Sequence, residues 1–204
     1  MDFVAVPLLD PRRVVVLLVD FQNDFCHSEP SPAAPPVTAG NAATAQRAQA
    51  FAASAQRLGA QIVYTRQVLD PARLTERQRR RESLGGLCLL GSFGAELFLT
   101  PLTGAAIVDK LRYDIWQSTD WARYVEDHDV EGLVISGVEL RCCVLHAVLG
   151  AEERGFAYTV PLDLVSGLDS GEDTYNEWTR RYLRDVHNAP ETSAHLLDAW
   201  TSRR

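Results

Sequence analysis

Three side chains whose types can together perform nucleophilic catalysis lie at or just beyond apolar runs of the chain. Asp20 ends the run VVVLLVD, Lys110 ends the run AAIVDK, and Cys143 follows the run GLVISG after the short segment VELRC. A cysteine attacks as its thiolate, so it needs a group that accepts its proton and a cation that stabilises the charge. A carboxylate and an ammonium group can serve in these two roles. Each residue alone has an ordinary structural explanation, but the combination predicts an enzyme.

The three apolar runs are expected to be strands of one sheet. The runs before Asp20 and Cys143 are continuous rather than alternating, which is typical of parallel strands covered on both faces. The carboxyl ends of parallel strands meet at one edge of the sheet, so the three side chains are expected to converge there. Cys143 also lies near the start of a predicted helix, where unpaired N–H groups and the helix dipole favour an anion. With Lys110 nearby, we expect its thiolate to form readily.

Strand and helix signals alternate along the chain and predict one α/β domain over residues 1–204. The expected strands are residues 14–20, 61–65, 105–110, 132–137 and 156–160, with a short sixth strand at 185–187. The expected helices are residues 38–58, 120–129, 140–154, 173–184 and about 193–200. This alternation predicts a three-layer α/β/α sandwich with a mostly parallel, about six-stranded, Rossmann-like sheet.

Composition argues against several classes of partner. The 204 residues are 46% hydrophobic, and 27 acidic residues exceed 20 basic ones, so no broad positive face for nucleic acid is expected. No apolar stretch approaches the roughly 18 residues that cross a bilayer, and the first residues lack the features of a signal peptide. The four cysteines have neither disulfide-scaffold nor zinc-site spacing. We therefore expect a cytoplasmic protein with free thiols that acts on a small molecule.

Two stretches interrupt the alternation of strands and helices. Residues 28–38 are rich in proline and alanine, which predicts an irregular loop over the sheet edge and a possible lid for a pocket. The second stretch carries a cluster of arginines, namely Arg73, Arg77, Arg79, Arg80 and Arg81. A solvated helix face or a subunit contact is the favoured interpretation, and an arginine that binds a substrate carboxylate is the alternative.

Three sequence blocks carry a resemblance to a known family. They are LLVDFQNDFC around Asp20, GSFGAEL with VDKLRYDIW around Lys110, and LVISGVELRCCVLHAVLGAEERGF around Cys143. The chain resembles the isochorismatase-like cysteine hydrolases, which include nicotinamidase, N-carbamoylsarcosine amidase and isochorismatase. The resemblance implies a catalytic triad of Asp20, Lys110 and Cys143, because the family's cysteine comes six residues after the glycine that closes its strand, here Gly137. It also implies a homo-oligomer, either a dimer or a tetramer.

The resemblance further implies a cis peptide bond between Val138 and Glu139. Such a bond would turn the backbone N–H of Glu139 toward that of Cys143, and the two N–H groups would form an oxyanion hole. Leu140 departs from the family pattern, since many relatives have threonine there. A hydroxyl group that helps to fix the cysteine loop is therefore absent, which puts the geometry of this loop in question.

No metal or other cofactor is expected. Nicotinamidases bind a metal through an Asp-x-His pair and a further histidine after the second strand, but here this region reads IVYTRQVLDPARL and contains no histidine. The five histidines of the chain are scattered over different predicted elements. The glycine-rich segment LGGLCLLGSFG lacks the lysine and hydroxyl residue of a phosphate-binding loop.

The expected reaction is hydrolysis of a C–N bond of amide, lactam or ureido type in a small molecule, through a thioester on Cys143. Candidates to line an apolar pocket are the residues that flank the triad in sequence, Phe25, Tyr113, Ile115 and Trp116. Apolar residues at such positions belong to the core more often than to a pocket. Asp114 and Trp116 replace small or phenyl side chains of relatives, so the floor of the pocket is expected to be remodelled.

Two other functions remain open at this point. An isochorismatase-type vinyl ether hydrolase would use Asp20 as a general acid and would need no thiol, so the presence of Cys143 counts against it. A catalytically silent binding protein on the same fold is the second alternative, and Leu140 is the feature that keeps it open.

Overall fold

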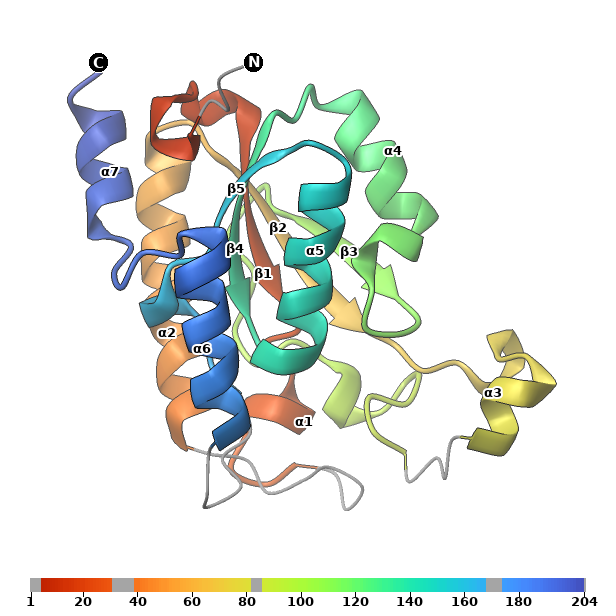
Figure 1. Cartoon of the computed structure of the whole chain (residues 1–204). Helices are drawn as coiled ribbons and strands as arrows, with labels where there is room; N and C mark the ends of the chain where they lie inside the picture. Colours follow the sequence, from red (N-terminus) through yellow and green to blue (C-terminus); the bar gives the residue numbers. More distant parts are fainter. Residues whose placement is uncertain (1–4, 31–38, 82–85, 168–173, 204) are drawn as a thin grey trace.

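A parallel β-sheet forms the centre of the computed structural model, which describes residues 5–30, 39–81, 86–167 and 174–203 (Figure 1). Within these residues the sheet has five strands in the order β3-β2-β1-β4-β5, and each neighbouring pair is parallel. The strands are β1 (Val14–Val19), β2 (Gln61–Gln67), β3 (Ala106–Lys110), β4 (Gly132–Gly137) and β5 (Ala157–Thr159). Because β2 and β4 flank β1 on opposite sides, the strand order reverses between β1 and β4. Ligands of open α/β sheets bind at the carboxyl ends of such a pair.

Helices cover both faces of the sheet, which confirms the predicted three-layer sandwich (Figure 1). On one face, α2 and α7 bury Ala52 and Trp200 in a cluster with Val16 of β1. On the other face, α4 and α5 bury Trp121 and Val148 in a second cluster. The helices are α1 (Asn23–Cys26), α2 (Ala39–Arg57), α3 (Glu76–Arg81), α4 (Thr119–Asp127), α5 (Leu145–Glu153), α6 (Thr174–His187) and α7 (Ala194–Thr201).

Short helical turns lie between these elements. They are 3₁₀ turns at Val6–Leu8, Pro11–Arg13, Pro71–Arg73, Phe93–Ala95, Ile115–Gln117 and Leu162–Leu164, and one π-helical turn at Leu140–Val144. None of the helices in the described part of the chain is both long and apolar enough to cross a bilayer.

Strand β1 explains why an unbroken apolar run is needed at the centre of the sheet. All six of its residues are buried, because helices pack on both of its faces. Side chains alternate along a strand, so Val14, Val16 and Leu18 join the α2 cluster, whereas Val15, Leu17 and Val19 join the α5 cluster. The chain can place a polar group only where β1 ends, and that residue is Asp20.

The structure corrects the predicted elements at two places. The sixth strand at residues 185–187 is wrong, because these residues form the last turn of α6. Asp185 accepts an ion pair from Arg181 one turn earlier, and Val186 is 56% exposed rather than buried in a sheet. The helix expected from residue 140 begins as a π turn and becomes α-helical at Leu145. Most of the predicted lid, residues 31–38, lies outside the described residues, as does residue 173 at the start of the predicted helix 173–184.

Gly137 closes β4 where no side chain fits. Its φ is 138°, and a Cβ atom there would lie 2.3 Å from the Val19 carbonyl oxygen. We expect Gly137→Ala to lower the free energy of unfolding by about 2 kcal/mol, because β1 and β4 must move apart. Gly155→Ala is the matched control: its φ is 71°, but no atom lies within 4 Å of the added Cβ, so it should cost about 1 kcal/mol. Equal losses for the two variants in urea unfolding would contradict the steric explanation.

Candidate active site

Asp20 follows β1 directly and is held by Thr65 of β2. Its φ is 52°, in the left-handed region that few residues other than glycine adopt. The Thr65 hydroxyl accepts a hydrogen bond from the Asp20 N–H at 3.1 Å and donates one to Asp20 Oδ1 at 2.6 Å. Both residues are completely buried. Thr65 thus fixes the backbone and the carboxylate of Asp20 together, and Oδ2 is directed to other partners.

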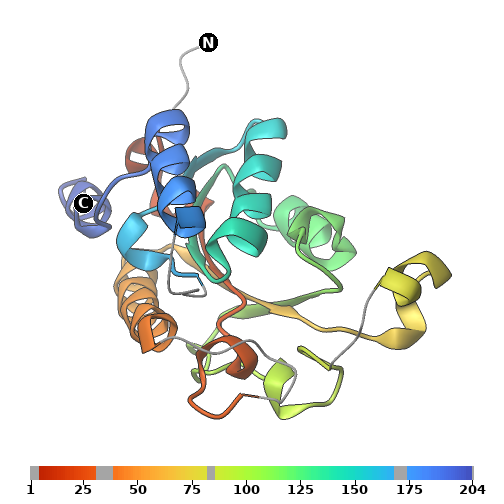
Figure 2. The same ribbon diagram turned by 60° about the horizontal axis from the view of Figure 1, so that its bottom comes forward.

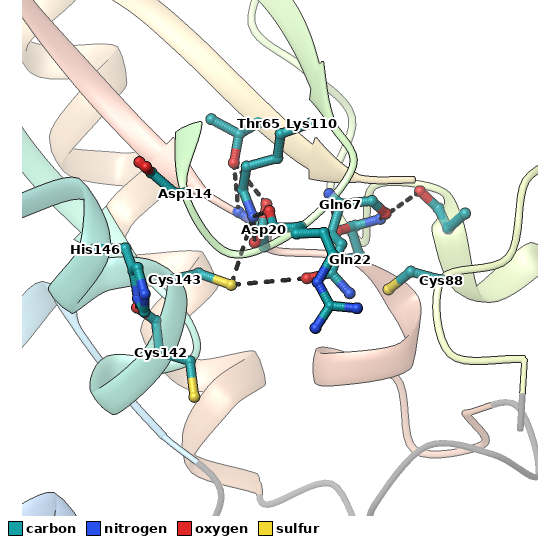
Figure 3. Close-up of polar contacts among 12 residues, drawn as sticks. Asp20, Gln22, Thr65, Gln67, Cys88, Lys110, Asp114, Cys142, Cys143 and His146 are labelled. Carbon is teal, nitrogen blue, oxygen red and sulfur yellow. Dashed lines mark hydrogen bonds and ion pairs between the residues drawn. The ribbon is translucent and has the colours of Figure 1, made fainter. Parts of the chain in front are cut away.

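Lys110, the last residue of β3, brings its ammonium group to the same place (Figure 3). Its Nζ lies 2.6 Å from Asp20 Oδ2 and 3.5 Å from Cys143 Sγ. It also donates a hydrogen bond to the Arg112 carbonyl oxygen at 2.9 Å. The side chains of Lys110 and Asp20 are 1% and 0% exposed, so this ion pair is shielded from water. The structure therefore brings together the three residues that the sequence singled out.

Cys143 lies in the π turn that joins β4 to α5. The Glu139 carbonyl oxygen accepts hydrogen bonds from the N–H groups of Cys142 and Val144, at 3.0 and 3.2 Å. Single π turns within helices frequently occur at functional sites. The turn holds the Cys143 sulfur against the lysine, while the sulfur of Cys142 points away from it (Figure 3).

Two expectations about this turn are answered by the structure. The peptide bond between Val138 and Glu139 is cis, as the resemblance implied. Leu140, which replaces the usual threonine, is fully buried in the same apolar cluster as Cys143. Its N–H donates to the Ser166 carbonyl oxygen at 2.9 Å. Apolar packing and this hydrogen bond hold the turn where many relatives use a hydroxyl group.

Two glutamines that the sequence reasoning missed border the triad. Gln67, the last residue of β2, is 7% exposed, and its Oε1 lies 3.9 Å from Cys143 Sγ (Figure 3). Gln22 Nε2 donates to the carbonyl oxygens of Gln67 and Ala95, at 2.9 and 2.7 Å, and its Oε1 accepts from the Gln67 N–H. Thr65 and Gln67 lie two residues apart on one face of β2. This pair of polar residues at the end of a largely apolar strand is the feature of the sequence that could have indicated Gln67 as a site residue.

The family of the chain follows from a comparison of its sequence with family profiles. The profile of the isochorismatase domain matches residues 14–186, which is most of the chain and includes all three residues of the cluster. The chain belongs to the isochorismatase family. A comparison with curated proteins finds no match.

Several solved structures share the fold of this chain. A cysteine hydrolase from Pseudomonas syringae pv. phaseolicola has a TM-score of 0.82 at 19% identity, over 100% of this chain and 99% of that one. N-carbamoylsarcosine amidase from Thermoplasma acidophilum has a TM-score of 0.68 at 21% identity, over 87% and 94%. A nicotinamidase from Bacillus subtilis has a TM-score of 0.68 at 19% identity, over 87% and 98%. At such identities the likeness concerns the fold.

Burial controls the ionisation of the cluster in this isochorismatase-family protein. The pKa of the Cys143 thiol lies well above its usual value, first because the sulfur is buried and then because Asp20 is negatively charged, although Lys110 acts in the opposite direction. Burial is the largest single influence on the pKa of Lys110 and acts to lower it, but the charges of Asp20 and Cys143 and the hydrogen bonds to both residues together outweigh burial, so the pKa is raised. The expectation of a readily formed thiolate is therefore wrong. These shifts favour the neutral thiol of Cys143 and the charged ammonium group of Lys110.

The raised pKa of Cys143 predicts slow alkylation at neutral pH. Iodoacetamide reacts with the thiolate, so its rate at Cys143 should still increase above the usual thiol pKa of 9.0. Asp20→Asn removes a negative charge and should move the rate profile to lower pH, whereas Lys110→Met should move it to higher pH. Peptide mass spectrometry after timed labelling measures each cysteine separately. A native profile that levels off below pH 9.0 would contradict this prediction.

Four residues were expected to line a pocket, and the structure places them in different surroundings. Tyr113 is 40% exposed beside α5, with its ring 5.8 Å from the ring of His146. Phe25 and Ile115 are buried in the two core clusters. The Trp116 ring stacks on Phe156. Phe156 directly precedes β5, the edge strand on the opposite side of the sheet from β3.

Packing against α5 decides the position of Trp116. Its Nε1 donates to the Ala147 carbonyl oxygen at 3.0 Å, and a Cβ at Gly150 would overlap the indole ring. The partly buried ring thus packs between sheet and helix, and the expectation that Trp116 contacts substrate stays a prediction. Tyr113 stays a candidate. Among the described residues no set of three or more His, Cys, Asp and Glu side chains is arranged to hold a metal ion, and the expectation of no cofactor stays a prediction.

Proposed function

We propose that this protein is a cysteine-dependent hydrolase that cleaves a C–N bond of a small amide, lactam or ureido compound through a thioester. One observation carries the proposal: Lys110 Nζ lies 2.6 Å from Asp20 Oδ2 and 3.5 Å from Cys143 Sγ, at the carboxyl edge of the sheet. A nucleophile, a proton acceptor and a cation within contact distance form the arrangement that nucleophilic catalysis by cysteine requires.

The first half of the reaction forms the thioester. Asp20 accepts the proton of the Cys143 thiol while the sulfur attacks the carbonyl carbon. The N–H groups of Glu139 and Cys143 bind the oxyanion, and Asp20 then donates the proton to the leaving nitrogen as the C–N bond breaks. General acid–base catalysis contributes about 10²- to 10⁴-fold, and one oxyanion donor contributes about 3–4 kcal/mol.

The second half returns the enzyme to its starting state. A water molecule loses a proton to Asp20 and attacks the thioester carbonyl, the C–S bond breaks, and Cys143 recovers its proton. Lys110 stays protonated throughout and balances the negative charge, whether it resides on Asp20 or on the sulfur. The raised pKa values of the Cys143 thiol and the Lys110 ammonium group support this assignment of protons to the two residues.

The surroundings of the triad favour a small, partly apolar substrate. Gln67 presents a carboxamide beside the sulfur, which can hydrogen-bond to the amide or carbonyl group of a substrate. Tyr113 lies at the exposed side of the cysteine turn, with the Arg112 guanidinium 5.3 Å from its ring centroid. We propose that Gln67 orients the reacting group and that Tyr113 contacts the remainder of the substrate.

A panel of amides, lactams, ureas and carbamoyl compounds tests the proposal. Release of ammonia or an amine from one compound, together with an acyl mass on the peptide that contains Cys143, is the expected result. A vinyl ether hydrolase would act only on vinyl ether compounds and would still turn them over after Cys143→Ala. If the protein is instead a silent binding protein, a compound of the panel would raise its melting temperature but no product would form.

A further inference from the structure

The carboxamide of Gln67 lies against the reactive sulfur. The Cys143 thiol donates a hydrogen bond to Gln67 Oε1 over 3.9 Å, whereas Lys110 Nζ donates to the sulfur from 3.5 Å (Figure 3). An amide oxygen accepts hydrogen bonds and cannot donate them, so it stabilises a thiol beside it and repels a thiolate. Gln67 and Lys110 therefore act on the sulfur in opposite directions.

The backbone of Gln67 is held at both its N–H and its carbonyl group by one side chain. Gln22, which is completely buried, accepts from the Gln67 N–H at 2.8 Å and donates to the Gln67 carbonyl oxygen at 2.9 Å. The other N–H of the Gln22 carboxamide donates to the Ala95 carbonyl oxygen at 2.7 Å. Helix α1, which begins directly after Gln22, accordingly lies beside the turn Phe93–Ala95 at the carboxyl edge of the sheet (Figure 2). The carboxamide of Gln67 thus starts from a fixed position.

The proposed reaction needs the thiol proton at Asp20 and not at Gln67. Asp20 Oδ1 accepts from the Thr65 hydroxyl at 2.6 Å, and Oδ2 lies 2.6 Å from Lys110 Nζ, so the carboxylate is already fixed in place. What remains is to turn the thiol hydrogen from one acceptor to the other. A donor that takes over Gln67 Oε1 would release the thiol hydrogen for Asp20.

A substrate can supply this donor through the nitrogen of the bond that is cleaved. This nitrogen is bonded to the carbon that the sulfur attacks, so it comes within contact distance of the sulfur and of the Gln67 oxygen beside it. An amide N–H is a stronger donor than a thiol S–H, so it displaces the thiol from Oε1. A fully substituted nitrogen carries no hydrogen and cannot do this.

We propose that Gln67 couples recognition of the substrate to release of the Cys143 proton. Gln67 Oε1 holds the thiol hydrogen until an N–H on the scissile nitrogen replaces it. Asp20 then takes the thiol proton and later donates it to the same nitrogen as the C–N bond breaks. This role rests on the proposed hydrolysis, and it restricts the substrates to amides, lactams and ureido compounds whose scissile nitrogen carries a hydrogen. Gln22 is a positioning residue for Gln67.

Labelling of Cys143 with iodoacetamide tests the restraint on the thiol without any substrate. Gln67→Met keeps the length of the side chain but removes the oxygen, so its rate profile should move to lower pH and its rate at pH 8 should rise at least about threefold. Gln67→Glu places a carboxylate beside the sulfur and should lower this rate. Asp20 and Lys110, the charged groups that act on the sulfur, are the same in all chains. Gln61→Met, at the amino end of the same strand, is the matched control and should leave the profile unchanged.

Paired substrates test the recognition of the N–H group. A compound that the native chain hydrolyses is compared with its counterpart whose nitrogen is fully methylated. We expect native kcat/KM to favour the N–H compound by at least about 100-fold, and Gln67→Met to reduce this preference to about tenfold or less. Steric exclusion of the methyl groups would keep the native preference in the variant.

Two results would overturn the role of Gln67: a Gln67→Met chain that is labelled no faster than the native chain, or a preference for the N–H compound that stays at the native value. If the native chain hydrolyses no compound of the panel, the proposed hydrolysis fails, and the labelling rates still decide whether Gln67 restrains the thiol. Circular dichroism melting shows whether each variant folds. If Gln67→Met does not fold, Gln67→Asn withdraws the oxygen by one methylene group and should give the same faster labelling.

Discussion

Cys143→Ala is expected to abolish turnover of any compound that the native chain hydrolyses. The sulfur forms the bond to the substrate in the proposed reaction, and no other group in the cluster can replace it. Loss of a nucleophile that acts together with its partners typically lowers kcat by about 10⁴-fold or more. The measurement is product release at saturating substrate, by the native and variant chains under identical conditions.

The neighbouring cysteine provides the control for this result. Cys142→Ala removes a thiol of the same turn, but the sulfur of Cys142 points away from Lys110 (Figure 3). We expect this variant to keep turnover within about threefold of native, because the Cys142 side chain is partly exposed and its truncation leaves the triad intact. Full activity of Cys143→Ala, or equal loss in both variants, would exclude the thioester mechanism.

Lys110→Met should destabilise the fold more than any other single change to the triad. The variant leaves Asp20 as a completely buried carboxylate without its cation, although the Thr65 hydrogen bond stays. Removing one partner of a buried ion pair typically costs about 3–5 kcal/mol, because the other charge is left uncompensated. Urea unfolding followed by circular dichroism measures the change at pH 7.

A double variant separates the ion pair from simple packing. Asp20→Asn/Lys110→Met removes both charges, so it should recover much of the stability that Lys110→Met loses. If the double variant is less stable than Lys110→Met alone, the loss arises from packing of the side chain and not from the unpaired carboxylate.

The carboxyl ends of β1 and β4 could be predicted because both strands are buried along their whole length, which requires a nearly unbroken apolar run. The polar residue after such a run can only lie at the sheet edge, as Asp20 does. Thr65 was not predicted as a partner of Asp20, because its contact depends on register. Leu18 pairs with Tyr64, and this alignment, which periodicity does not specify, places the next threonine beside the aspartate.

Two features near the triad depended on burial that only the assembled layers create. Cys143 was expected to ionise readily from its place near a helix start, but the packed π turn leaves it 2% exposed and raises its pKa. Trp116 is close to the triad in sequence, yet the turn Ile115–Gln117 directs its ring between α5 and the start of β5. The segment 185–187 has only three residues, which are too few to show whether the periodicity is that of a strand or of a helix.

Thr65 contacts Asp20 through a single oxygen atom that serves as acceptor and donor at once. The main chain and the side chain of Asp20 are therefore fixed together, because a rotation of either one disturbs the hydrogen bonds that both make to the Thr65 hydroxyl group. Substitutions in the connecting segments can therefore alter the surroundings of the triad without moving Asp20, because its position is fixed by hydrogen bonds to the neighbouring strand β2.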